Sequence, residues 1–326
     1  MYELNDKDNY SPPNQDNDTH INVKFTQFRD EDNDNSVKRK GSKKSKNKNK
    51  EEDTKYDYIS KKSDENEYFG NKNMNKIIID DEEEYSDKIN FKTAFSYFSR
   101  CDYKEEQEMI DNEMKLNQKK KSFIKKICEC FYGGLPLKIK LQKNLICCMT
   151  KVAYDDSIDM HYKILSTIYL FFTKEKECPK TGKHWEKIGF QSLTPKSDLR
   201  SVGMVAALQM LFFICGYPSF SYTVYKFFLE KNCEWLFAVT AINITQICYI
   251  TLRDEYLDKF CVKKDDAIWI FNEFYVGIFY NLNQYLMENN EELTAEFISQ
   301  CLEKIRKRCT SSSEIDALLW NTKKAT

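Results

Sequence analysis

Two stretches of the chain carry no charged residue, and they constrain the fold more than any other feature. They span residues 201–225 and 235–252, each about long enough for a helix that crosses a membrane. Polar or helix-breaking residues interrupt both: Gly216 and Pro218 break the first, and Asn243 lies at the centre of the second. Membrane helices tolerate such groups poorly unless other protein groups pair with them. We therefore expect buried helices in the core of a soluble domain, with membrane insertion as the less favoured alternative.

Apolar residues recur with the period of a helix in the rest of the C-terminal two thirds. In residues 158–173, for example, Met160, Ile164 and Ile168 share one helical face, and residues 155–157 offer N-cap side chains. Helices are expected over residues 137–149, 158–173, 219–230, 235–252, 265–288 and 294–308, with one more ending at Gly216. No segment alternates with period two for long, so strands are not expected. The predicted fold class is all-α, a multi-helix domain around one core.

The first 90 residues differ from the rest in composition. Residues 1–90 are mostly Asn, Asp, Lys, Glu and Ser with few aliphatic side chains, so they cannot bury enough apolar surface to offset the entropy of ordering. We expect a long disordered, low-complexity arm there. Residues 91–131 are expected to be a helical lead-in. Gly133 and Gly134 interrupt the pattern and indicate a compact domain over residues 132–326.

The arm contains one dense basic run, from Lys38 to Lys50. The net charge of the whole chain is −1, so no overall field favours nucleic acid or membrane. A basic run of this kind suits contact with an anionic membrane or a nuclear address, and the competing interpretation is a solvated tail. No aromatic side chains alternate with the lysines to stack on bases, so nucleic acid is not an expected partner.

The twelve cysteines and three histidines do not form a recognisable metal site. The pairs Cys128/Cys130 and Cys147/Cys148 lack the spacers typical of zinc sites, and no His pairs with a Cys at finger spacing. We expect reduced thiols in a cytoplasmic protein, with peripheral membrane contact left open. The chain also lacks a glycine-rich phosphate loop. No metal and no cofactor are therefore expected, and the protein is not expected to bind nucleotide itself.

The segment from Trp185 to Gly203 is the most informative one for function. It reads WEKIGFQSLTPKSDLRSVG and ends where the first uncharged stretch begins. The pattern predicts that Arg200 lies in the first turn of the following helix, where the helix dipole disfavours a cation by about 0.3–1 kcal/mol. An arginine at such a place, beside Asp198, suggests a role other than helix stability.

This segment resembles the signature of the ELMO domain family. The matching positions are Trp185, Ile188, Gly189, Phe190, Gln191, Pro195, Asp198, Arg200 and Gly203. Residues 211–218 and 237–245 resemble two further family motifs, and the resemblance covers roughly residues 135–289. Two positions depart from the pattern: Leu199 stands where the family usually has Phe, and Ser201 where it usually has Gly.

The resemblance implies a function and a set of site residues. Small ELMO-domain proteins act as GTPase-activating proteins for Arf and Arl GTPases, and the arginine equivalent to Arg200 is the catalytic candidate, supplied in trans to the partner's active site. Asp198 is the candidate orienting partner. Residues expected at the binding surface are Trp185, Gly189, Phe190, Gln191, Ser201 and Gly203. The expected setting is membrane traffic or cytoskeletal regulation.

Two alternatives remain open from sequence. In the first, Arg200 is structural and pairs with Asp198 or Glu186, while Trp185 and Phe190 anchor the segment to the core. In the second, the domain is a non-catalytic scaffold that binds a GTPase or a Rac exchange factor in actin remodelling. Exposure of Arg200 separates a structural arginine from one that is available to a partner.

Overall fold

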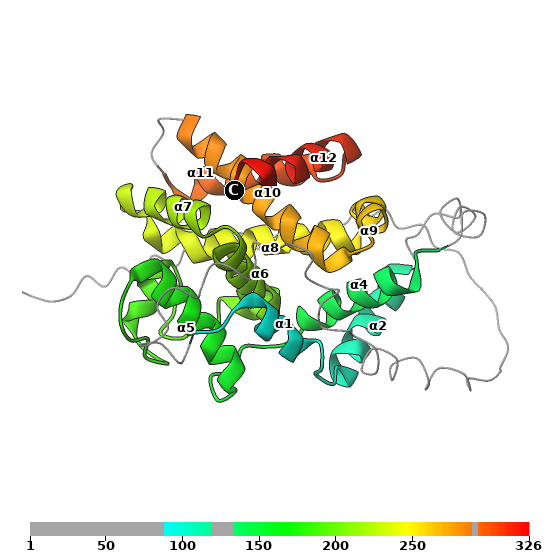
Figure 1. The fold of residues 1–326 in the computed structure, drawn as a ribbon, viewed down its shortest axis with the longest axis horizontal. Coiled ribbons are helices and arrows are strands. Elements are labelled where there is room, and N and C mark those ends of the chain that lie inside the picture. Colours follow the sequence, from blue (N-terminus) through cyan, green and yellow to red (C-terminus); the bar gives the residue numbers. More distant parts are fainter. Residues whose placement is uncertain (1–87, 119–133, 289–292, 326) are drawn as a thin grey trace, which may run out of the picture. The chain divides into compact units, whose positions relative to one another are not determined.

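A computed structural model describes residues 88–118, 134–288 and 293–325, and every regular element in these ranges is a helix (Figure 1). The longer helices are α1 (Phe91–Phe98), α2 (Lys104–Gln118), α4 (Leu137–Met149), α5 (Asp159–Thr173), α6 (Gly203–Gly216), α7 (Pro218–Glu230), α8 (Phe237–Arg253), α9 (Asp258–Lys264), α10 (Ala267–Glu288), α11 (Ala295–Arg308) and α12 (Ser312–Asn321). Short 3-10 turns are η2 (Lys183–Ile188), η3 (Leu199–Ser201), η4 (Glu234–Leu236) and η5 (Thr322–Lys324). The all-α prediction is confirmed. Residues 1–87 of the arm predicted over residues 1–90, with its basic run, lie outside the described residues.

Helix boundaries agree with the sequence prediction where turn residues define them. The helix predicted over residues 137–149 is α4, and the one predicted from residue 294 is α11, whose N-cap Thr294 accepts a hydrogen bond from the Phe297 amide at 3.1 Å. The caps predicted for α5 are wrong. Its N-cap is Ile158, and the Asp155 carboxylate instead accepts hydrogen bonds from the amide and hydroxyl of Ser157.

Helix α6 lies at the centre of the core. Every residue from Gly203 to Cys215 is buried, and α5, α7, α8, α10 and α1 all pack against it. A helix covered on all sides needs no polar face, which explains the absence of charge in its sequence.

By length and composition, residues 234–253 are apolar enough to cross a membrane, and so are α6 and α7 together, which meet at a bend of 114°. However, 72% of the first span is buried within the protein, as the core interpretation predicts.

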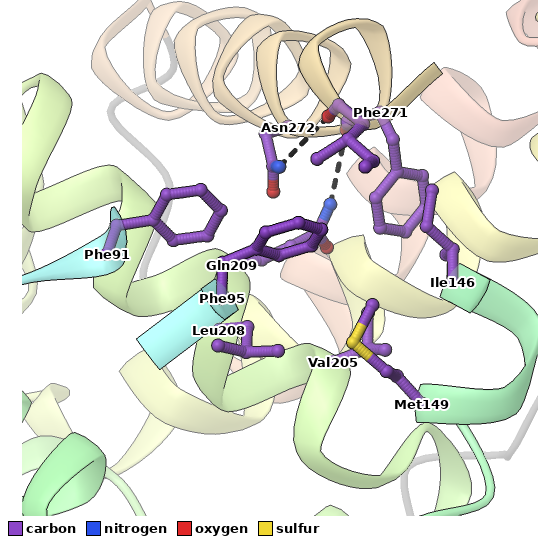
Figure 2. Close-up of a pocket in the computed structure, with 10 residues that line it drawn as sticks. Phe91, Phe95, Ile146, Met149, Val205, Leu208, Gln209, Phe271 and Asn272 are labelled. Carbon is purple, nitrogen blue, oxygen red and sulfur yellow. Dashed lines mark hydrogen bonds between the residues drawn. The ribbon is translucent and has the colours of Figure 1, made fainter. Parts of the chain in front are cut away.

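The core extends further toward the N-terminus than the domain start predicted at residue 132. Phe91 of α1 meets Phe212 of α6 edge to face at 5.1 Å, and the Ile89 amide donates to the Thr167 hydroxyl of α5 at 3.0 Å. Figure 2 shows Phe91 and Phe95 of α1 lining the same pocket as Gln209, whose side-chain amide donates to the Phe271 carbonyl. Helix α1 is thus part of the packed body and is more than a lead-in.

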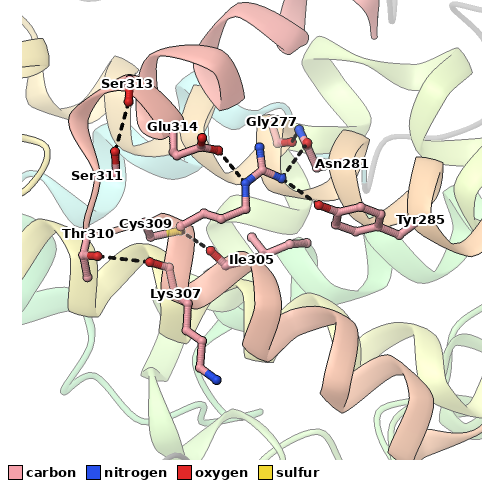
Figure 3. A network of polar contacts seen from close by, with 11 residues as sticks. Gly277, Asn281, Tyr285, Ile305, Lys307, Cys309, Thr310, Ser311, Ser313 and Glu314 are labelled. Atoms are coloured by element: carbon pink, nitrogen blue, oxygen red, sulfur yellow. Dashed lines mark hydrogen bonds and ion pairs between the residues drawn. The ribbon is translucent and has the colours of Figure 1, made fainter.

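The C-terminal helices are fastened to α10 by backbone contact and by one arginine. Gly277 of α10 lies so close to α12 that a Cβ there would be 2.2 Å from the Leu318 carbonyl oxygen. Arg308, at the end of α11, bonds to Glu314 at 2.6 Å, to the Tyr285 hydroxyl at 2.9 Å and to Asn281 at 3.4 Å (Figure 3). One guanidinium therefore joins α10, α11 and α12.

Replacing Arg308 with lysine is expected to lower the free energy of unfolding by about 1–2 kcal/mol, because an ammonium cannot reproduce the planar fork that reaches three acceptors. Urea unfolding of the full chain measures the change. Lys304→Ala is the matched control, since Lys304 is exposed on the same helix and should change stability by less than about 0.5 kcal/mol. Equal losses in the two variants would show that the Arg308 network contributes nothing specific.

Candidate functional site

The segment from Trp185 to Gly203 is anchored at its start by a buried tryptophan. Trp185 is fully buried, meets Tyr169 of α5 at 5.5 Å and Phe190 at 5.8 Å, and donates from its indole nitrogen to the Lys180 carbonyl at 3.3 Å. The Tyr225 hydroxyl of α7 donates to the Lys187 carbonyl at 2.9 Å. Turn η2 is therefore fixed against both α5 and α7.

Gly189 ends η2 and brings the segment against the start of α8. Its φ is +93°, and a Cβ there would lie 2.6 Å from the Ala238 amide nitrogen and 2.7 Å from the Glu234 carbonyl oxygen. Only glycine fits both this conformation and this approach. Gly189 and Phe190 are buried, so their contacts are within the chain and position the loop.

Gly203 fixes the other end of the segment. Its φ is +52°, and a Cβ there would lie 2.5 Å from the Val152 carbonyl oxygen and 2.7 Å from the Thr150 carbonyl oxygen. The same Val152 carbonyl accepts a hydrogen bond from the Met204 amide at 2.9 Å, which satisfies one of the first amides of α6. Gly203 is buried, so it packs on the chain's own backbone at the end of α4.

Between these two anchors, Arg200 lies in the short turn η3, and its predicted place in the first turn of α6 is wrong. The Pro195 carbonyl accepts hydrogen bonds from the amides of Asp198 and Leu199, which closes a turn that ends before the helix begins. Val202 (φ −136°) lies between η3 and α6, and Gly203, the first residue of α6, has a left-handed backbone (φ +52°). The buried Leu199 holds this turn to the core from below.

The Arg200 side chain is exposed, and no hydrogen bond or ion pair joins it to any described residue. Arg253, Arg306 and Arg308, by contrast, each lie within 2.6–2.9 Å of a carboxylate. Asp198 is near enough for the Arg200 charge to act on its pKa, yet the two do not form a salt bridge. Arg200 is therefore available to a partner, and Gln191 and Ser201 are exposed alongside it.

Asp198 is half-buried beneath this turn. Its carboxylate accepts hydrogen bonds from the Gln191 amide at 3.4 Å and from the Ser197 hydroxyl at 3.5 Å. Burial raises the pKa of Asp198, and these hydrogen bonds and the charge of Arg200 partly oppose that rise. The hydrogen bond from the Gln191 amide to the Asp198 carboxylate joins the two ends of the loop. Partial burial of the charged carboxylate opposes this stabilisation.

Replacing Asp198 with asparagine is expected to leave the protein at least as stable at neutral pH. The folded-state pKa of the carboxyl is raised, so its stabilising contribution is present below the unfolded value of 3.8 and is lost as pH rises through the folded value. An asparagine side chain has no charge to bury, so its stability does not fall in this way as pH rises. Its carbonyl oxygen still accepts the hydrogen bond from the Gln191 backbone amide. Urea unfolding at pH 7 and pH 4 measures it: the advantage of the variant should be larger at pH 7. A lower stability of the variant at both pH values would contradict this account.

Two features of the site were not predicted from the sequence. Leu193 is 54% exposed in the loop beside Arg200, and no spacing pattern marks an exposed leucine in advance. The hydroxyls of Ser192 and Ser197 bond across the loop at 2.6 Å. Among the residues with a described placement, no group of three or more His, Cys, Asp or Glu side chains is arranged to hold a metal ion, and the cysteines there are free.

Comparison with known proteins relates this geometry to one family. A family model described as ELMO/CED-12 matches residues 144–299. ELMO domain-containing protein 3 of Mus musculus is 25% identical over 226 residues, which are 68% of this chain and 58% of that protein. The Homo sapiens protein of the same name is 27% identical over 175 residues (52% of this chain, 46% of that protein). ELMO domain-containing protein 2 of Mus musculus is 25% identical over 146 residues (44% and 50%).

The chain thus spans about half the length of the curated relatives it matches. No solved structure matches it significantly. The matched range contains the whole segment from Trp185 to Gly203, with its two buried glycines and its exposed arginine. Residues 144–299 of this chain are a domain of the ELMO/CED-12 family.

Proposed function

We propose that this domain stimulates GTP hydrolysis by a small GTPase of the Arf/Arl group, and that Arg200 enters the partner's active site. The observation that carries the proposal is an exposed arginine without a described partner, held on a turn that is anchored at both ends. In phosphoryl transfer, negative charge spreads over the oxygens of the γ-phosphate. An arginine is suited to neutralise it, because its guanidinium is always charged and pairs with two oxygens at once.

The surroundings of Arg200 support this role. Trp185, Gly189 and Gly203 fix the backbone on either side of the turn, so little backbone freedom is lost when a partner binds. The Asp198 carboxylate accepts hydrogen bonds from Gln191 and Ser197 of the loop and forms no salt bridge with the Arg200 guanidinium. The family resemblance, in which the equivalent arginine is the catalytic candidate, points in the same direction.

The proposal is tested by single-turnover hydrolysis of GTP on a panel of purified Arf and Arl GTPases, with and without the full chain. Acceleration of at least one GTPase that depends on Arg200 is the expected result. If the full chain accelerates none of them under conditions in which it binds one, the catalytic proposal fails and the scaffold described next is favoured.

Ser201 supports a second candidate, a scaffold without catalysis. It is exposed directly beside Arg200, where the family usually has glycine, and its side chain hinders a close approach of another backbone. On this alternative, the domain binds a GTPase or a Rac exchange factor in cytoskeletal regulation, and Arg200→Ala leaves binding unchanged.

Both candidates fit a cytoplasmic protein with peripheral membrane contact through Lys38–Lys50. Flotation of the full chain with anionic liposomes at low and high salt tests that contact.

A further inference from the structure

A groove lies between the start of α5 and the segment that joins α1 to α2, and Val152 is among its lining residues. Its volume is about 340 Å³. Phe98 and Tyr97 of α1, Tyr103, and the loop of residues 152–158 form its walls, and Lys196 of the signature segment lies at its edge. The groove is thus next to the Arg200 turn but is built from different elements.

The floor of the groove contains a histidine with one free donor. His161 is 2% exposed and stacks on Phe98 at 5.4 Å. Its Nδ1 atom accepts a hydrogen bond from the Asp155 backbone amide at 3.2 Å, so in the neutral ring the proton is on Nε2. Burial lowers the pKa of His161 to about 4, which keeps the ring neutral at pH 7. No described residue accepts a hydrogen bond from Nε2.

The neighbouring Tyr154 adds a second polar group, which is fully enclosed. Tyr154 is 2% exposed, lines the groove, and its buried hydroxyl has no hydrogen-bond partner among the described residues. Buried polar groups are nearly always paired with protein, water or a ligand. The enclosed Tyr154 hydroxyl cannot meet an occupant of the open groove, so the His161 Nε2–H is the donor here that an occupant with an acceptor atom can use.

The rim of the groove is acidic. Its lining includes the carboxylates of Asp102, Glu106 and Asp155, and one ammonium, that of Lys196, a formal balance of −2 (three negative groups and one positive group). Asp102 pairs with Lys104 at 2.9 Å, and Asp155 is used by Ser157. Glu106 is half-buried, and no ion pair joins it to a described residue. It is therefore the carboxylate best placed to receive a cation.

We propose that this groove binds a short extended segment of a partner protein that presents an arginine or lysine side chain. The segment's backbone carbonyl accepts from the His161 Nε2–H, its cationic side chain pairs with Glu106, and the aromatic walls contact the side-chain stem. An acidic segment would be repelled by the rim, and a purely apolar one would leave the His161 Nε2–H without an acceptor. The inference concerns a surface separate from Arg200, and it does not depend on the GTPase step.

The experiment uses the full chain labelled with nitrogen-15 histidine. The chain has three histidines, His20, His161 and His184. His20→Gln and His184→Gln variants assign the resonances, with His161 found by elimination. The probe is acetyl-Ala-Arg-Ala-amide, and the peptides with norleucine or glutamate in the central position are its controls. The expected result is a saturable shift of the His161 Nε2–H resonance with the arginine peptide, weaker with norleucine and absent with glutamate.

Variants on α2 test the role of the charge. Glu106→Gln should weaken binding of the arginine peptide by about tenfold or more, the size expected for one charge-assisted hydrogen bond, while Glu108→Gln should leave it unchanged, since Glu108 is exposed and outside the groove. The proposal is overturned if the His161 resonance does not shift, if the glutamate peptide binds as well, or if Glu106→Gln binds like the wild type. None of these outcomes bears on GTP hydrolysis.

Discussion

Replacement of Arg200 by alanine is expected to lower the stimulated rate of GTP hydrolysis by about 10³-fold or more, to near the intrinsic rate of the GTPase. An arginine supplied in trans contributes about 10³–10⁵-fold in systems of this kind, because it neutralises charge that develops only in the transition state. The interaction is absent from the ground state, so binding to the GTPase loaded with a non-hydrolysable GTP analogue should change little. Single-turnover hydrolysis and an equilibrium binding assay measure the two quantities separately.

Two further variants define what the arginine supplies. Arg200→Lys should recover only a small part of the rate, because an ammonium lacks the planar fork that spans two phosphate oxygens. Lys196→Ala is the matched control, as Lys196 is an exposed cation in the same loop and should leave the maximal rate within about twofold. If Arg200→Ala stimulates as well as the wild type, Arg200 does not act on the phosphate and the scaffold becomes the better account.

Substitution of Gly203 by alanine is expected to be the most destabilising single change in the site, by roughly 2–5 kcal/mol. The left-handed backbone costs an L-residue about 1–2 kcal/mol, and overpacking typically costs a further 1–3 kcal/mol. Here the added Cβ would lie 2.5–2.9 Å from the carbonyl oxygens of Met149, Thr150 and Val152. These are backbone atoms and cannot rotate away, so α4 and α6 must separate.

Thermal and urea unfolding of the full chain measure this loss, which should lower the melting temperature by on the order of 10 °C. Gly134→Ala is a suitable control, since a Cβ there meets only the flexible end of the Lys140 side chain and should cost less than about 0.5 kcal/mol. A Gly203→Ala variant as stable as the control would mean that the close approach of α4 to α6 does not hold in solution.

The helices with one polar face were predictable from the sequence, and the reason is local. Residues 137–149 and 294–308 have an apolar stripe and clear end signals, so periodicity and capping residues locate α4 and α11. The prediction was weaker where tertiary contacts determine where a helix begins or ends. In α6 the apolar residues face every direction, so periodicity cannot define its first turn, and α9 and α12 are too short to show a pattern.

Some features of the candidate site were also predictable from the sequence, and others were not. The burial of Trp185 and Phe190 follows from their size and type, and the role of these residues as anchors was anticipated as one interpretation. The break between Arg200 and α6 was not anticipated, because it depends on a left-handed Gly203 pressed against the Val152 carbonyl, a contact between residues 51 positions apart in the chain. The free state of the Arg200 guanidinium likewise depends on where Asp198 points, which no sequence spacing determines.

The packing of α1 onto α6 separates the unit recognised by sequence similarity from the unit that can fold by itself. The family match begins at Asn144, inside α4, and ends at Ser299, inside α11. A recombinant fragment cut at those positions would lose α1, half of α4 and all of α12, and would uncover the aromatic surface around Phe212 and the bare backbone of Gly277. Such a fragment is expected to aggregate, and its inactivity would say nothing about Arg200. An autonomous folding unit has to begin no later than Ile89, which is buried and bonds to Thr167, and so include Asn90, whose side chain caps α1.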